Sequence, residues 1–297
     1  MNLDDEDESS NIIDRRGESG GGGGGRGLGG LGGGRLGIVG MIVVGGIALL
    51  LGQNPLEVIG AVNGVGGSGV GQPQETAEPA QPAALTGEHD KFIAKVLRST
   101  ERTWSAQFKS QLGQAYPQPK LVLFQGGVNS GCGQANSGMG PFYCPADRNV
   151  YLDASFFDDL SRRFGAPGDF AAAYVIAHEV GHHIQTVLGI SDQVQKARRG
   201  GDETEGNALS VRQELQADCL AGVWAFHNRA LLEAGDIEEG LRAAQAIGDD
   251  TLQRKSGGGV NPESFTHGSS AQRMRWLQRG LEAGQIAACD TFAARRL

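Results

Sequence analysis

The chain has 297 residues, enough for one large domain or two small ones, and a formal net charge of −8 at pH 7. No basic stripe is available to neutralise phosphates, which argues against a nucleic-acid-binding protein. The chain has 49 glycines among its 297 residues, well above the usual share of about 7%. Many of these glycines lie before residue 72. The amino-terminal quarter is therefore compositionally unlike the rest.

Residues 1–35 begin with a run of acids and continue into a glycine-rich stretch. Such a composition cannot bury a core, so we expect a disordered cytoplasmic segment. Residues 36–52 are apolar and uncharged, close to the lower limit of about 17 residues for a membrane-spanning helix. The apolar run starts too late for a cleaved signal peptide. It predicts an uncleaved transmembrane helix, with a buried glycine-rich helix as the alternative.

The positively charged residues set the predicted orientation of this helix. Four arginines precede it, at positions 15, 16, 26 and 35, whereas residues 53–90 contain neither Lys nor Arg. The positive-inside rule then keeps the amino terminus in the cytoplasm. The predicted localisation is the cell membrane, single-pass, with an extracytoplasmic carboxy-terminal domain. Residues 53–87, rich in Gly, Pro, Gln and Ala, are expected to form a flexible tether.

The folded domain is expected to occupy residues 88–297. Hydrophobic periodicity predicts helices at 89–112, 170–188, 211–234, 237–247 and 270–283. Alternating patterns predict two short strands, at 120–124 and 148–153. The expected fold class is α+β, helix-dominated with a small β-sheet, preceded by one transmembrane helix.

Four cysteines lie in this domain, and none forms a CxxC pair, which argues against a zinc ribbon. An even count outside the cytoplasm favours two disulfides. Cys132 and Cys144, twelve residues apart in a glycine-rich loop, are the easiest pair to close. Cys219 and Cys289 would then pair by elimination, and four buried thiols are the alternative.

The strongest chemical signal is the sequence His-Glu-Val-Gly-His at residues 178–182. On a helix, His178 and His182 lie on one face and can reach one metal ion. Glu179 is rotated by about 100° from His178, beside the metal, where it can act as a general base toward water. His183 points away from this face and is not expected to be a ligand. Gly181 is costly inside a helix, which indicates the close approach of another backbone or of a substrate.

A catalytic zinc needs a third protein ligand and one open position. Glu214 and Asp218 are again four residues apart on a predicted helix, next to small residues that let two helices approach. Glu214 is the expected third ligand, and Asp218 can accept the other ring N–H of a ligand histidine. A solvated acidic helix face is the alternative. Glu203 and Glu205 lie in what reads as a polar linker and weigh less.

Two further positions are candidates for the cleft. His267 precedes the last predicted helix and could donate a hydrogen bond to an oxyanion, or could serve only as a structural residue at the start of that helix. Tyr151 lies on the strand before the active-site helix, and an edge strand there could pair with an extended peptide.

The segments HEVGHHIQ, ELQADCLAGVWA, GPFYCPADRNVYLD, FGAPGDFAAAYVIAHE and SFTHGSSAQRMRW together resemble the neutral zinc metallopeptidase family of bacteria. The resemblance runs from about Asn11 to Phe292. It implies a single-pass membrane protein with a zincin-like domain. It also implies that His178, His182 and Glu214 are the zinc ligands and that Glu179 is the base. Asp218 is then a residue that supports the ligands without binding the zinc. The acidic stretch before Asn11 departs from the pattern.

The function that these features predict is hydrolysis of peptide bonds by a zinc-activated water, with a peptide or protein as substrate and Zn²⁺ as the cofactor. One alternative is a non-catalytic zinc-binding envelope or regulatory protein on the same fold, which an intact Glu179 disfavours. The other is a structural zinc, which would want a fourth Cys or His ligand.

Overall fold

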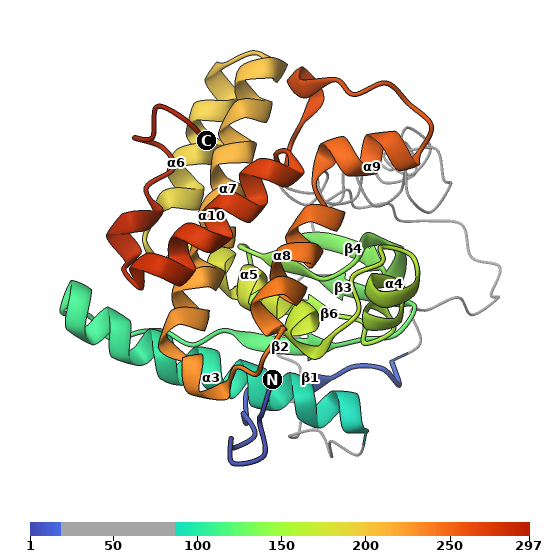
Figure 1. Ribbon diagram of the computed structural model, residues 1–297, viewed down its shortest axis with the longest axis vertical. Helices are drawn as coiled ribbons and strands as arrows, with labels where there is room; N and C mark the ends of the chain where they lie inside the picture. The colour runs from blue at the N-terminus through green and yellow to red at the C-terminus, as the bar shows by residue number, and fades with distance from the viewer. Residues whose placement is uncertain (19–86) are drawn as a thin grey trace, which may run out of the picture.

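The computed structural model describes residues 1–18 and 87–297. A small set of strands lies together, and helices flank it on more than one side (Figure 1). The main sheet has four strands in the order β1-β2-β6-β5. Its strands are β1 (Ile12–Asp14), β2 (Lys120–Leu123), β5 (Phe142–Cys144) and β6 (Asn149–Leu152). β1, β2 and β6 run parallel, β5 is antiparallel to β6, and a separate hairpin pairs β3 (Gly127–Ser130) with β4 (Gly133–Asn136).

Eight α-helices are found within the described ranges. They are α3 (Glu88–Gln107), α4 (Phe156–Arg162), α5 (Asp169–Val187), α6 (Ile190–Gly200), α7 (Glu203–His227), α8 (Asp236–Ala246), α9 (Asp249–Lys255) and α10 (Ser270–Ala283). A π-helical turn, η1 (Phe108–Leu112), continues α3. The helix-dominated α+β class with a small sheet therefore describes these residues correctly, and the predicted strands and helices are all present with shifted ends.

The central helix α5 is buried along almost its whole length, from Phe170 to Gln185. It lies against β5 and β6 on one side and against α7 and α8 on the other. Gly181 explains how α7 comes so close, because a Cβ at this position would lie 3.0 Å from the Cα atom of Ala217. The predicted close approach at Gly181 is thus an approach of the α7 backbone. Gly222 of α7 makes a similar contact with Gly280 of α10.

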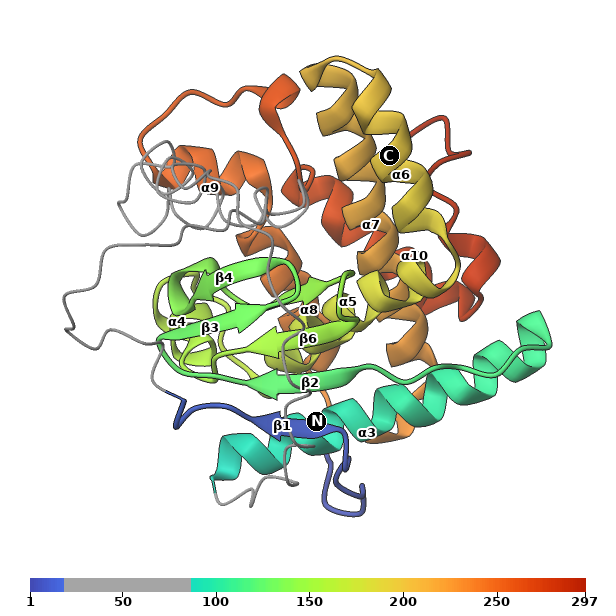
Figure 2. The same cartoon turned by 180° about the vertical axis from the view of Figure 1, so that it is seen from behind.

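The amino-terminal segment, residues 1–18, belongs to this fold. β1 pairs with β2 through Ile12 and Leu121, and Ile12 is buried in the main core (Figure 2). The segment also lies along α3, where Ser9 donates its backbone N–H to the Ala94 carbonyl. Its acidic side chains find partners, for example Glu6 with Arg102 at 2.7 Å. The expected disorder of residues 1–35 is therefore wrong for residues 1–18.

The predicted fold class is also wrong about the membrane. No helix within residues 1–18 and 87–297 is long and apolar enough to cross a bilayer, and residues 36–52, where the span was expected, lie outside the described residues. A single span there would put residues 1–18 and the domain on opposite sides of a membrane. Strand β1 excludes that arrangement, because it is hydrogen-bonded into the sheet of the domain. The single-pass localisation with a cytoplasmic amino terminus is corrected accordingly.

Both predicted disulfides are confirmed. Cys132 and Cys144 join the β3–β4 hairpin to β5, and Cys219 of α7 joins Cys289 in the carboxy-terminal turn. Disulfides of this kind are typical of proteins that fold in an oxidising compartment. The second one lies directly beside Asp218, so it fastens the carboxy-terminal segment to the helix that carries two of the candidate site residues.

Candidate metal centre

Helix α5 brings His178 and His182 onto one face, as their spacing predicts. Their ring centroids are 4.8 Å apart and the rings are nearly perpendicular. Both side chains are buried, and Glu179 between them is buried too. An imidazole pair that projects from one helix turn in this way can bind a single ion.

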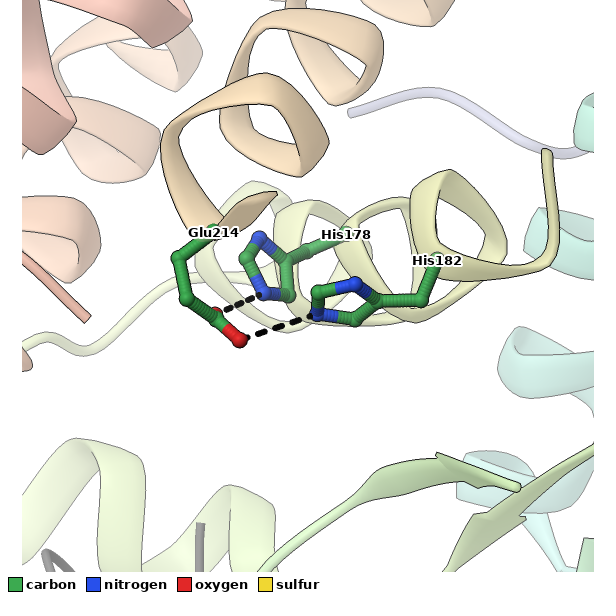
Figure 3. A group of neighbouring side chains, drawn as sticks. All are labelled: His178, His182 and Glu214. Carbon is green, nitrogen blue, oxygen red and sulfur yellow. Dashed lines mark hydrogen bonds and ion pairs between the residues drawn. The ribbon is translucent and has the colours of Figure 1, made fainter. Parts of the chain in front are cut away.

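Helix α7 supplies the third side chain of the cluster. Glu214 Oε2 lies 3.2 Å from Nε2 of His178, and Oε1 lies 3.5 Å from Nε2 of His182 (Figure 3). Glu203 and Glu205 are not in a linker but in the first turn of α7, where they are exposed. From Glu205, Glu214 is nine residues further along the helix, which is about 13–14 Å. The structure thus brings Glu214 to the two histidines and leaves the other two glutamates outside the cluster.

The donor set fits a zinc ion. Two imidazole nitrogens and a carboxylate are ligands that Zn²⁺ takes in catalytic sites. Two ligand atoms at about 2.0–2.1 Å from a tetrahedral zinc are about 3.3 Å from each other. The nitrogen–oxygen distances of 3.2 and 3.5 Å match this separation. No fourth His, Cys, Asp or Glu of residues 1–18 and 87–297 joins the group, so its geometry is that of an open site.

Asp218 fixes the orientation of His178. Its Oδ1 lies 2.8 Å from Nδ1 of His178, and it also accepts hydrogen bonds from Tyr174 and from Arg273 of α10. Burial disfavours the charged carboxylate, but Arg273 and His178 outweigh it and hold the pKa of Asp218 below its usual range. Because an ionised Asp218 can only accept, Nδ1 of His178 carries a hydrogen, and Nε2 is the ring nitrogen that faces Glu214.

A second chain of hydrogen bonds orients His182. Its Nδ1 lies 2.9 Å from Oε1 of Gln185. The amide nitrogen of Gln185 donates to the Gln213 carbonyl and to Gln216, so its oxygen faces the ring. His182 therefore donates from Nδ1, and its Nε2 faces Glu214. Such outer hydrogen bonds usually set the tautomer and basicity of metal-binding histidines.

Glu179 lies beside the cluster and lines the same pocket as its three members. Burial raises the pKa of Glu179, an effect that His178, His182 and the backbone N–H of Tyr143 partly oppose. A raised pKa brings a carboxylate closer to the range in which it both accepts and releases a proton near neutral pH. The Glu179 carboxylate thus lies in the same pocket as the cluster, with a pKa above its usual value.

His267 also lines this pocket, at the loop before α10. Asp249 holds it, with Oδ1 at 3.2 Å from Nδ1 and Oδ2 accepting the backbone N–H groups of Thr266, His267 and Gly268. Burial disfavours the imidazolium, but Asp249 outweighs it, so the pKa of His267 is raised. The protonated ring has a second N–H that Asp249 does not use.

The remaining predicted positions lie elsewhere. His183 is bonded to the Tyr143 hydroxyl and the Pro117 carbonyl, and burial lowers its pKa to about 4. Tyr151 does not line the cleft. It lies on the inner strand β6, stacked on Phe142 and bonded to Asp147, and the edge strand beside the cleft is β5.

Sequence reasoning missed three residues of the site: Tyr174, Asp249 and Arg273. Tyr174 could have been found, because it lies four residues before His178 and so shares its helix face. Asp249 and Arg273 carry no such local signal. Each reaches the site from another element, and only the tertiary packing of α9 and α10 brings them there.

Known proteins resemble this chain over most of its length. A family model described as "Putative neutral zinc metallopeptidase" matches residues 1–292, including the acidic start that the sequence pattern left unexplained. "Uncharacterized protein YpfJ" of Escherichia coli strain K12 is 48% identical over 293 residues, covering 96% of each chain. "Uncharacterized protein Rv2575" of Mycobacterium tuberculosis strain H37Rv is 38% identical over 269 residues, covering 84% of this chain and 86% of its own. No solved structure matches the chain. The chain belongs to the neutral zinc metallopeptidase family.

Proposed function

We propose that the protein is a zinc-dependent peptidase in which His178, His182 and Glu214 hold the metal. The observation that carries this proposal is the position of Glu214, whose two oxygens lie 3.2 and 3.5 Å from the Nε2 atoms of the two histidines. The backing by Asp218 and Gln185 supports it, because each ring uses Nδ1 for that hydrogen bond and turns Nε2 toward Glu214. Zinc, when bound, polarises the scissile carbonyl and increases the acidity of water.

Glu179 is the general base in this proposal. Its carboxylate takes a proton from the water that adds to the scissile carbonyl carbon. The C–N bond then breaks, and Glu179 delivers the proton to the leaving amine nitrogen. Burial, which raises its pKa, makes the carboxylate a better acceptor for the first transfer and still allows the second.

His267 is proposed to stabilise the oxyanion that forms on the carbonyl oxygen. Asp249 binds Nδ1 and raises the pKa of the ring, which favours the imidazolium. The Nε2–H of that imidazolium can donate into the pocket. A donor directed at developing negative charge is usually worth about 10²–10³-fold in rate.

The test is a joint measurement of zinc content and of cleavage. We expect one zinc ion per chain, cleavage of a broad peptide library, and loss of cleavage with a chelator followed by recovery on addition of zinc. Zinc bound without cleavage of any peptide would favour the non-catalytic zinc-binding protein. Failure to bind zinc at all would contradict both the peptidase and the non-catalytic zinc-binding protein.

A further inference from the structure

The pocket beside the candidate metal centre has one strongly apolar wall. It reaches from Glu179 and His178 to side chains of several other segments. The apolar members are Pro141, Phe156, Phe164, Val175 and Ile247. Phe156 and Phe164 pack on each other with ring centroids 6.1 Å apart, so this wall is built from fixed rings. Pockets with an apolar lining of this kind bind apolar groups in many proteins.

Besides the metal cluster, the polar side chains on its lining are Tyr174, Glu179, His267 and Arg273, and hydrogen bonds to Asp218 or Asp249 hold all of these except Glu179. Arg273 directs its guanidinium to Asp218, Tyr174 and the Ile247 carbonyl. His267 is held by Asp249. The apolar wall itself offers no partner to a charged substrate side chain, and burying a charge without a partner is unfavourable.

A second pocket also reaches His182, and it is lined by residues of a different kind. Most of its lining residues carry polar groups: Tyr143, Pro145, His182, Thr186, Ser191, Asp192, Gln195 and Gln213. Ser191 bridges this wall, because its hydroxyl lies 3.1 Å from that of Thr186 and accepts from Gln213 at 3.3 Å. The two pockets share His182, so they meet at the candidate metal centre.

We propose that the site selects its peptide substrates asymmetrically. The side chain on one side of the scissile bond is large and apolar and enters the pocket of Phe156, Phe164, Val175 and Ile247. The residue on the other side lies over the polar pocket and is not selected for apolar bulk. This inference rests on the proposed peptidase function and specifies its substrate class. Even one methylene in an apolar pocket discriminates by about 10–200-fold, so Phe or Leu should exceed Ala by at least about tenfold in kcat/KM.

Ile247 gives the cleanest variants. It is only partly buried at the end of α8, and its backbone carbonyl, which binds Arg273, survives substitution. Ile247→Trp narrows the pocket and Ile247→Ala widens it. Ile237, on the same helix and 39% exposed, does not line the pocket, so Ile237→Trp is the matched control.

The experiment uses the zinc-loaded full chain and two readouts. The first is the cleavage profile of a peptide library randomised on both sides of the scissile bond. The second is calorimetric binding of two dipeptide hydroxamates that differ only in a benzyl or a methyl side chain, which requires no turnover. We expect an apolar preference on one side only, tighter binding of the benzyl compound by at least about tenfold, and loss of both preferences in Ile247→Trp but not in Ile237→Trp.

The two readouts separate the two proposals. Cleavage with no one-sided apolar preference, or a preference that both Ile247 variants leave unchanged while still folded, overturns the asymmetric selection and leaves the peptidase standing. A benzyl preference without cleavage of any peptide supports the pocket and rejects the proposed peptidase activity.

Discussion

Helix α5 carries parts of two clusters of possible metal ligands, and they differ in almost every other respect. His178 and His182 meet Glu214 in the interior. At the start of the same helix, Asp169 lies close to Asp236 and Glu239, partly exposed to solvent. In this second cluster a cation is already present, because the amino group of Met1 lies 2.6 Å from Asp169 and 3.2 Å from Asp236.

The difference shows what distinguishes a metal centre from a group of acids. The buried cluster has two imidazoles whose Nε2 atoms face one carboxylate, and another side chain holds the Nδ1 atom of each ring. The acidic cluster has only carboxylates, and a protonated amine satisfies it. Proximity of three ligand atoms is common to both, so the donor types and their supporting hydrogen bonds carry the distinction.

The largest effect is expected from Glu214→Ala. Loss of one of three ligands should reduce zinc content to a small fraction of the wild-type value, as measured by metal analysis after dialysis. The double variant Glu203→Ala/Glu205→Ala removes two exposed carboxylates from the same helix and should bind zinc normally. Normal zinc content in Glu214→Ala would show that the buried cluster is no more a metal centre than the acidic one.

Glu179→Gln should separate binding from chemistry. The amide keeps the size of the side chain but cannot take a proton, and Glu179 is not a ligand. Hydrolysis should fall by about 10²–10⁴-fold while zinc content and thermal stability hardly change. Loss of zinc would make Glu179 a ligand. Unchanged cleavage with zinc retained would point to another base, with His267 the first to test.

Local spacing is why the centre of the site could be predicted from the sequence. His178, His182, Glu214 and Asp218 follow helical periodicity, which the chain specifies over four residues. Strand β1 could not be predicted in the same way. Its partner, Leu121 for Ile12, is more than a hundred residues away, and the acidic composition around it suggests disorder. Arg273 is also a distant partner, 55 residues from the aspartate that it binds.

The start of α7 is a second place where the prediction from the sequence was wrong. Glycines 200, 201 and 206 suggested a linker, yet the helix begins at Glu203 because the Asp202 side chain accepts the backbone N–H of Glu205. This cap satisfies one of the free N–H groups of the first turn. The linker assignment therefore failed at a helix boundary, whereas Glu214, further inside the helix, was assigned correctly to it.

Asp218→Asn tests the hydrogen bond between Asp218 and His178. The amide can present either its oxygen or its NH₂ group to Nδ1 of His178, and it loses the charge that Arg273 binds. We expect zinc affinity or activity to fall by about 10- to 100-fold, less than for Glu214→Ala. Competition with a chelator of known affinity measures the change. An effect as large as that of Glu214→Ala would mean that Asp218 is itself a ligand.

The smallest effect is expected in the acidic cluster. Burial lowers the pKa of the Met1 amino group, but hydrogen bonds and ion pairs with Asp169, Glu233 and Asp236 outweigh it and raise the pKa from 8.0 to about 10. A group whose pKa is higher in the folded protein stabilises the fold fully below its unfolded value. That contribution is lost as the pH rises from about 8 through about 10. Since Asp169 and Glu233 are substantially exposed, screening should limit it to about 1 kcal/mol or less.

Asp236→Asn should therefore lower the unfolding temperature slightly at pH 7 and flatten its decline between pH 8 and 10, with zinc content unchanged. Glu238→Gln removes the same charge from an exposed position on the same helix and should keep the wild-type pH profile. Thermal unfolding of the three proteins across this pH range measures the difference. A fall in zinc content in Asp236→Asn would contradict the separation of the two clusters, and an unchanged pH profile would mean that the amino group does not hold the amino-terminal segment. Because β1 is anchored independently by its pairing with β2, the segment should stay in the sheet even when this ion pair is weakened.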